Sequence, residues 1–172
     1  ESFDVVFCHR VLQHTPDPEK GIRCIAKKVK PGGVLFAHCY KKDWRSLSSY
    51  KYKYRWFTKR IPSPWVFWFV EKYGARLSDL QDRAHSKNRY VQILANNFIP
   101  FDYHPVFANA DKEQLLEISK LCTFDALTPK YDKPMTPKHF RRVIEEEGFE
   151  IQHLYGEDPR RSPLYMTAVK NG

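Results

Sequence analysis

Two histidines, an arginine and a cysteine lie close together at the end of the first apolar run of the chain. The run is residues 3–8, Phe-Asp-Val-Val-Phe-Cys, and His9, Arg10 and His14 follow it directly. A neutral histidine can take a proton from a hydroxyl or an amine, and ligands of α/β proteins bind beyond the ends of buried strands. We therefore expect this loop to line a ligand crevice, with His14 as the candidate base.

The elements around this loop are those of a strand, helix, strand unit. Residues 3–8 are too apolar for a half-exposed strand, which indicates burial on both faces of a parallel sheet. Asp-Pro at 17–18 predicts the start of a helix that has Val29 on its apolar face. Pro-Gly-Gly at 31–33 predicts its end, and a second buried strand is predicted over 34–40.

The C-terminal part returns to this pattern. Thr-Pro at 136–137 predicts a helix start and Gly148 its end. Two strands follow at 149–155 and 164–170, and the short connection 156–163 favours an antiparallel pair. We expect an α/β core formed by residues 1–43 and 129–172.

Residues 44–128 are predicted to be a mostly helical insertion. Residues 41–60 contain eight lysines and arginines but one aspartate, and aromatic residues alternate with the basic ones in the sequence. The apolar cluster at 65–70 is interpreted first as core packing, then as a lid, then as a contact with an anionic membrane. Nucleic acid is not an expected partner, since no recognisable binding module accompanies the charge.

Composition narrows the class of protein further. The chain has 172 residues, a formal net charge of +9 and four cysteines without Cys-x-x-Cys spacing. We expect buried thiols and no metal site, which suits a reducing cytoplasm. No apolar run reaches the roughly 20 residues that cross a bilayer.

Two segments resemble class I S-adenosylmethionine-dependent methyltransferases. FDVVFCHRVLQHTPDPEKGIRCIAKKVKPGGVLF is similar to the family's strand of Phe-Asp-x-Val type, its Leu-x-His-x-x-Asp loop and its Lys-Pro-Gly-Gly turn, and YDKPMTPKHFRRVIEEEGFEI is similar to its late helix and following strand. The resemblance implies a partial Rossmann-like sheet holding strands 4-5-7-6 of the family order, with the last strand antiparallel. It also implies S-adenosylmethionine as cofactor.

The resemblance implies roles for several residues. Cys8, His9 and Arg10 would lie along the methionine part of the cofactor, or His9 and Arg10 would merely satisfy the loop backbone. His14 would be the catalytic base, or would cap the helix at Asp17 or pack on the next strand.

Four further residues are candidates for acceptor binding because of their places beside the same crevice. His38 and Tyr40, at the end of the second strand, would contact the acceptor, or be buried against the insertion. Tyr131 and Asp132 would lie beside the crevice mouth, where Asp132 is equally suited to a turn before Pro134.

The start of the chain departs from the family pattern. The glycine-rich cofactor loop of the family precedes the matched segment, and this sequence has seven glycines and no Gly-x-Gly. An apolar edge strand is unusual, so we expect that residues 3–8 belong to a truncated sheet whose other strands lie upstream. A homodimer through this edge is the alternative.

The predicted function is S-adenosylmethionine-dependent methyl transfer to a small-molecule or lipid-like acceptor. A metabolite, a lipid precursor, a sugar and a polyketide all remain open. The alternative is a non-catalytic scaffold or binding domain whose basic aromatic insertion holds a partner or an anionic membrane.

Overall fold

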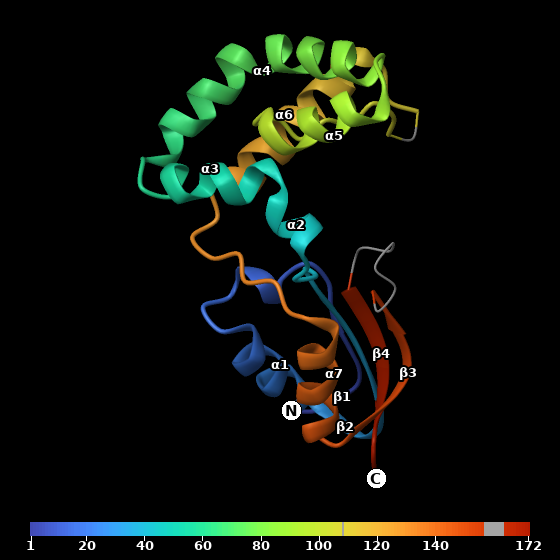
Figure 1. The fold of residues 1–172 in the computed structure, drawn as a ribbon. Coiled ribbons are helices and arrows are strands. Elements are labelled where there is room, and N and C mark those ends of the chain that lie inside the picture. The colour runs from blue at the N-terminus through green and yellow to red at the C-terminus, as the bar shows by residue number, and fades with distance from the viewer. Residues whose placement is uncertain (108, 157–163) are drawn as a thin grey trace. The chain divides into compact units, whose positions relative to one another are not determined.

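The computed structural model describes residues 1–107, 109–156 and 164–172 (Figure 1). The chain divides into two compact units, one formed by residues 1–46 with 131–172 and the other by residues 47–130. The first unit contains β1 (Phe3–Cys8), a 3-10 turn η1 (Leu12–His14), α1 (Pro18–Ala26), β2 (Val29–Cys39), α7 (Pro137–Glu146), β3 (Phe149–Tyr155) and β4 (Leu164–Lys170). The short helix α2 (Trp44–Ser48) contains the boundary.

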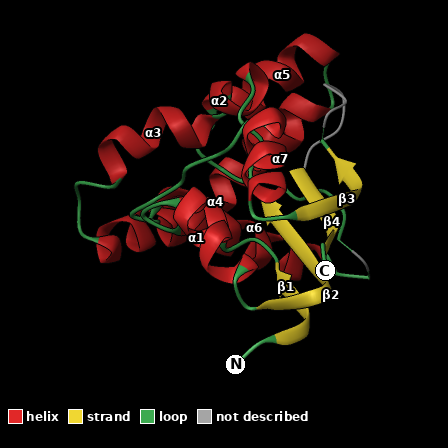
Figure 2. Cartoon of the chain, turned by 90° about the horizontal axis from the view of Figure 1, so that it is seen from below, coloured by secondary structure: helices red, strands yellow, loops and turns green. Residues whose placement is uncertain are grey.

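A four-stranded mixed sheet organises the first unit, in the order β1-β2-β4-β3. Strands β1 and β2 are parallel, whereas β4 is antiparallel to both of its neighbours. Helices α1 and α7 lie beside the same face of this sheet (Figure 2). The predicted order of strands and helices and the antiparallel last pair are confirmed, while 157–163 of their connection lie outside the described residues.

The core of the first unit lies between the sheet and these two helices. Its fully buried members come from α1, β2, α7 and β4, and they include Ile22, Leu35, Phe140, Ile144, Leu164 and Met166. Arg23 of α1 adds an ionic link, since its guanidinium lies 2.6 Å from Glu146 and 2.8 Å from Glu147 at the end of α7. The two helices are therefore joined both by apolar packing and by ion pairs.

The cap of α1 agrees with the sequence prediction, but its end does not. The Asp17 side chain accepts the backbone N–H of Lys20, with Pro18 in the first turn. The helix ends at Ala26, so that Val29 lies in β2, is 2% exposed and pairs with Phe3. The helical spacing of Val29 predicted that it belongs to the helix. Its burial in the sheet places it in β2 instead.

The expected burial of β1 on both faces is wrong. Phe3 is 49% exposed, Val5 64% and Phe7 66%. On one side β1 pairs with β2, and none of the described residues pairs with its other side. The side chains that face away from α1 and α7 are consequently left open, and the Phe7 ring stacks on Phe36 at 4.7 Å.

The second unit is helical, as the sequence predicts. It contains α3 (Tyr50–Thr58), α4 (Ser63–His85), α5 (Arg89–Phe98) and α6 (Lys112–Leu127). Asp111 and Gln114 form the expected capping box at the start of α6. None of the described helices is both long enough and apolar enough to cross a membrane.

The apolar cluster at 65–70 packs only in part. Val66 and Val70, one turn apart on α4, are buried with Tyr50 and Leu127. Trp65, Phe67 and Trp68 are 65%, 53% and 51% exposed. Core packing is thus confirmed for the valines and wrong for these three aromatic residues, because one face of a helix cannot bury consecutive side chains.

The cysteines are less uniformly buried than predicted. All four are thiols, of which Cys39 is buried, Cys8 and Cys122 are half-buried, and Cys24 is exposed. Cys24 lies on the outer side of α1, where helical spacing places it away from the buried Ile22 and Ala26.

Candidate functional site

The loop after β1 is tied to the end of β2 by a backbone hydrogen bond. Arg10 has a φ of 57°, and its N–H donates to Nδ1 of His38 over 3.2 Å. Left-handed backbone is uncommon for a residue with a side chain. His9 lies beside the same ring, with centroids 4.9 Å apart.

His38 is neutral in the folded protein. It is 1% exposed, and its pKa is lowered to about 4 by burial, with smaller effects of the charges on His9 and Arg10. Because Nδ1 accepts from Arg10, the ring proton must be on Nε2. His38 therefore holds the loop in place, and its burial leaves little surface for the predicted acceptor contact.

His14 has a defined tautomer as well. Its Nδ1 lies 3.2 Å from the backbone carbonyl oxygen of Tyr131, and a carbonyl oxygen can only accept. Nδ1 therefore carries the proton, and the lone pair is on Nε2. His14 does not cap α1, since the side chain of Asp17 does so itself.

Tyr40 completes a row of rings at the end of β2. Its ring lies edge to face with His14 at 5.6 Å and with His38 at 6.0 Å. The backbone carbonyl of Tyr40 accepts the N–H of Met135, which fixes the segment that carries Tyr131 beside the strand end. Four predicted site residues, from three separate parts of the chain, thus lie together.

Cys8 and Cys39 are the last residues of β1 and β2, and Asp132 lies close enough to Cys39 to affect the pKa of its thiol. Cys8 is half-buried, and burial raises the pKa of its thiol. Burial also raises the pKa of Cys39 to about 12, with minor effects of Asp132 and Cys8. Neither thiol is a thiolate at neutral pH, so this site offers no sulfur nucleophile.

Gln13 is a site residue that the sequence did not reveal. Its side chain is fully buried, and neither its Nε2 nor its Oε1 has a hydrogen-bond partner among the described residues. Its backbone carbonyl accepts the N–H of Lys133 over 2.8 Å. A buried amide without partners is costly and suits a polar ligand group. No local pattern in residues 11–15 signals this burial.

The residues present fit only one side of a cofactor such as S-adenosylmethionine. The Gln13 amide and the ring pair of His14 and Tyr40 suit the methyl and acceptor side. Phosphate or carboxylate cradles in such folds use glycine-rich turns at helix N-termini, and this sequence has no Gly-x-Gly. The chain therefore does not fit the adenosine and carboxylate end.

Comparisons with known proteins find similarity in the N-terminal part of the chain, which carries the loop after β1. Residues 1–37 match the family model of the methyltransferase domain. A 36-residue stretch is 56% identical to the ubiquinone biosynthesis O-methyltransferase of Aliivibrio fischeri, over 21% of this chain and 15% of that protein. The protein of the same name from Proteus mirabilis is 25% identical over 118 residues, 62% of this chain and 40% of the relative.

The first 37 residues are therefore similar to part of a methyltransferase domain. The matched part contains β1, the loop with His14, α1 and most of β2. The chain spans 15% of the length of the first of these curated relatives and 40% of the second.

Proposed function

We propose that the chain provides the acceptor side of an S-adenosylmethionine-dependent methyltransferase that methylates an oxygen of a small or lipid-like acceptor. In this proposal β1, β2, β4 and β3 are strands 4, 5, 7 and 6 of the family sheet. The O-methyltransferase names of the relatives support oxygen as the methylated atom. The observation that supports the proposal is the contact of His14 Nδ1 with the Tyr131 carbonyl oxygen, which leaves the Nε2 lone pair available to act as a base.

The chain's own residues have distinct tasks in this reaction. Bound S-adenosylmethionine supplies a methyl group on a sulfonium, which is already a good electrophile. Nε2 of His14 takes the proton of the acceptor hydroxyl, while the Tyr131 carbonyl holds Nδ1–H and stabilises the resulting imidazolium. His38 holds the loop in place by accepting the backbone N–H of Arg10. The role of the second unit as an acceptor lid stays a prediction.

Binding of the demethylated cofactor tests this proposal on the chain as it is. We expect S-adenosylhomocysteine to shift the backbone amide resonances of residues 8–14 and 38–40 in a ¹⁵N-labelled sample, with weak affinity because the adenosine contacts are missing. Gln13→Met should reduce the shifts, whereas the exposed Gln152→Met on β3 should not. Saturating ligand without shifts in the loop would overturn the proposal.

A base role for His14 has a separate readout. Radiolabelled methyl transfer to a panel of phenols and alcohols should fall at least tenfold in His14→Asn, because Asn cannot take the proton. The loss should diminish for acceptors of low pKa, which need no base. Equal loss for all acceptors would assign His14 a positioning role instead.

The second candidate function is binding to an anionic membrane surface. The observation that favours it is an exposed set of aromatic and basic side chains in the second unit. Trp56 and Trp68 are 68% and 51% exposed, and each has a cation over its ring, Arg60 at 4.9 Å and Lys72 at 4.5 Å. Tryptophan beside basic residues is typical of interfacial anchors.

Vesicles of anionic lipid test this candidate directly. Co-sedimentation should retain the chain on phosphatidylserine vesicles and not on phosphatidylcholine vesicles, and Arg60→Gln with Lys72→Gln should release it. Lys27→Gln with Lys28→Gln removes the same charge from an exposed pair in the first unit and serves as the matched control. Equal retention on both lipids would remove the candidate.

A further inference from the structure

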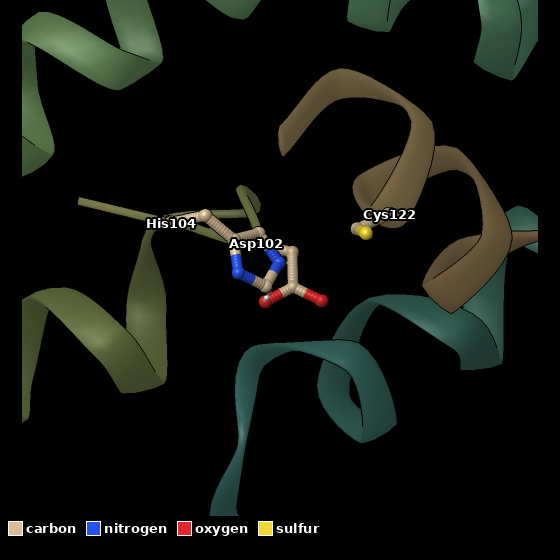
Figure 3. Close-up of side chains that lie close together, drawn as sticks. All are labelled: Asp102, His104 and Cys122. Carbon is tan, nitrogen blue, oxygen red and sulfur yellow. Dashed lines mark ion pairs between the residues drawn. The ribbon is translucent and has the colours of Figure 1, made fainter. Parts of the chain in front are cut away.

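Three side chains of the second unit bring different metal-ligand atoms together. Asp102 and His104 lie on the segment between α5 and α6, and Cys122 lies on α6 (Figure 3). One carboxylate oxygen, one imidazole nitrogen and the thiol sulfur all lie within 4.8 Å of one another. This cluster is far along the chain from the predicted methyl-transfer residues, and it does not depend on the proposed function.

The imidazole of His104 has an unusual environment. Its Nε2 is buried and has no hydrogen-bond partner among the described residues. It forms an ion pair with Oδ1 of Asp102 at 3.7 Å when the ring is protonated, a distance too long for a hydrogen bond. Two ligands on a tetrahedral ion with bonds of about 2.0–2.3 Å are roughly 3.3–3.8 Å apart. The separation therefore suits an ion between the two atoms better than a direct bond.

Helix α6 holds the backbone of both ligands. The N–H of Asp102 donates to Thr123 Oγ1 over 2.8 Å, and the N–H of His104 donates to Ser119 Oγ over 3.2 Å. Ser119 and Thr123 are buried, and they flank Cys122 on the same helix. Such outer contacts orient ligands before an ion arrives. The side chains of Asp102 and His104 remain 44% and 32% exposed, which leaves a path for entry.

We propose that Asp102, His104 and Cys122 bind one zinc-type divalent ion, with a fourth position open to water. A thiolate and an imidazole select borderline transition metals, whereas calcium and magnesium prefer oxygen ligands alone. Three protein ligands are fewer than the four of closed structural zinc sites. On binding, the Cys122 thiol gives up its proton to solvent and its sulfur forms the bond to the ion.

Such an ion would fasten the segment around Asp102 to α6. Phe101, next to the first ligand, is already 1% exposed, so the segment is anchored at one end in the helical core. Binding to the folded state alone stabilises that state by mass action. We therefore expect zinc to raise the unfolding midpoint of the second unit.

Cobalt substitution tests the site with a thiolate-specific signal. Titration of the reduced full chain with Co²⁺ should give one equivalent of visible ligand-field absorption together with a sulfur-to-cobalt charge-transfer band in the near ultraviolet. Cys122→Ser should abolish the charge-transfer band, and the exposed Cys24→Ser should retain it. Calorimetry with Zn²⁺ should show one site and proton release that depends on the buffer.

Two further variants keep the test independent of folding defects. Asp102→Asn keeps the backbone bond to Thr123 and should weaken zinc about tenfold or more, while its circular dichroism stays that of the parent chain. Asp125→Asn, which removes a nearby carboxylate outside the cluster, should bind zinc as the parent does. Absence of a charge-transfer band, or a band that survives Cys122→Ser, would overturn the proposal.

Discussion

The backbone amide of Arg10 donates to Nδ1 of His38, and this bond exists only while Nδ1 carries no proton. The pKa of His38 is about 4 in the folded chain against an ordinary 6.5, because the ring is buried. Between these values the unfolded chain binds the proton and the folded chain does not. Stability is therefore lost as the pH falls through this window, and this contribution is constant above it.

A pH series of unfolding measures this contribution. From about pH 7 to about pH 5, we expect the free energy of unfolding to fall by roughly 1–2 kcal/mol because of His38. His38→Asn keeps an acceptor near the Nδ1 position without a titrating ring, so its urea unfolding should lack this part of the slope. An unchanged slope in the variant would contradict the assigned cause.

Gln13→Met should stabilise the chain while harming ligand binding. Removal of an unpartnered buried amide by an apolar side chain of similar size is expected to gain about 1 kcal/mol. Thermal unfolding of the variant measures the gain, and S-adenosylhomocysteine titration measures the loss. The exposed Gln152→Met should gain nothing, and destabilisation by Gln13→Met would indicate that the amide has a structural partner.

The two glycines at 33 and 148 should respond differently to alanine. Gly148 has a φ of 78° and open space around it, so Gly148→Ala should cost about 1 kcal/mol from backbone strain alone. A Cβ on Gly33 would lie 2.9 Å from the backbone oxygen of Asp4, between β1 and β2. Gly33→Ala should therefore cost more, by urea unfolding, than Gly148→Ala. The reverse order would be inconsistent with the described strand pairing.

The open edge of β1 predicts self-association. Val5 and Phe7 are 64% and 66% exposed on a strand that pairs on one side only within the described chain. Exposed apolar edges recruit further strands, and we propose a homodimer through this edge. Sedimentation equilibrium should show a dimer that Val5→Lys converts to monomer, while Val11→Lys, in an exposed position of the following loop, leaves it dimeric. A parent chain that is monomeric at all concentrations would exclude it.

Local signals in the sequence predicted the parts of the fold that depend on neighbouring residues. Asp17 caps α1 and Thr136 caps α7, because a cap needs only backbone amides two or three residues away. Val29 was misplaced, since its membership of β2 depends on pairing with Phe3 and not on its neighbours.

The site was predicted only in outline for the same reason. The loop after β1 follows from the strand, but the partners of His14 and His38 lie 117 and 28 residues away in the sequence. Asp102, His104 and Cys122 have no recognisable metal-ligand spacing, because a loop and a helix bring them together. The burial of Gln13 likewise results from packing that no local pattern encodes.

The bond that orients His14 ends on a main-chain oxygen of Tyr131. Substitution of the Tyr131 side chain leaves that oxygen in place, so side-chain variants at position 131 would not report on this bond. The orientation of the imidazole is thereby insulated from side-chain replacement at that position. Chemical ligation can replace the peptide bond after Tyr131 by an ester, which weakens the carbonyl as an acceptor without altering any side chain. Such a substitution would test whether the orientation of His14 depends on this carbonyl, which side-chain mutations cannot do.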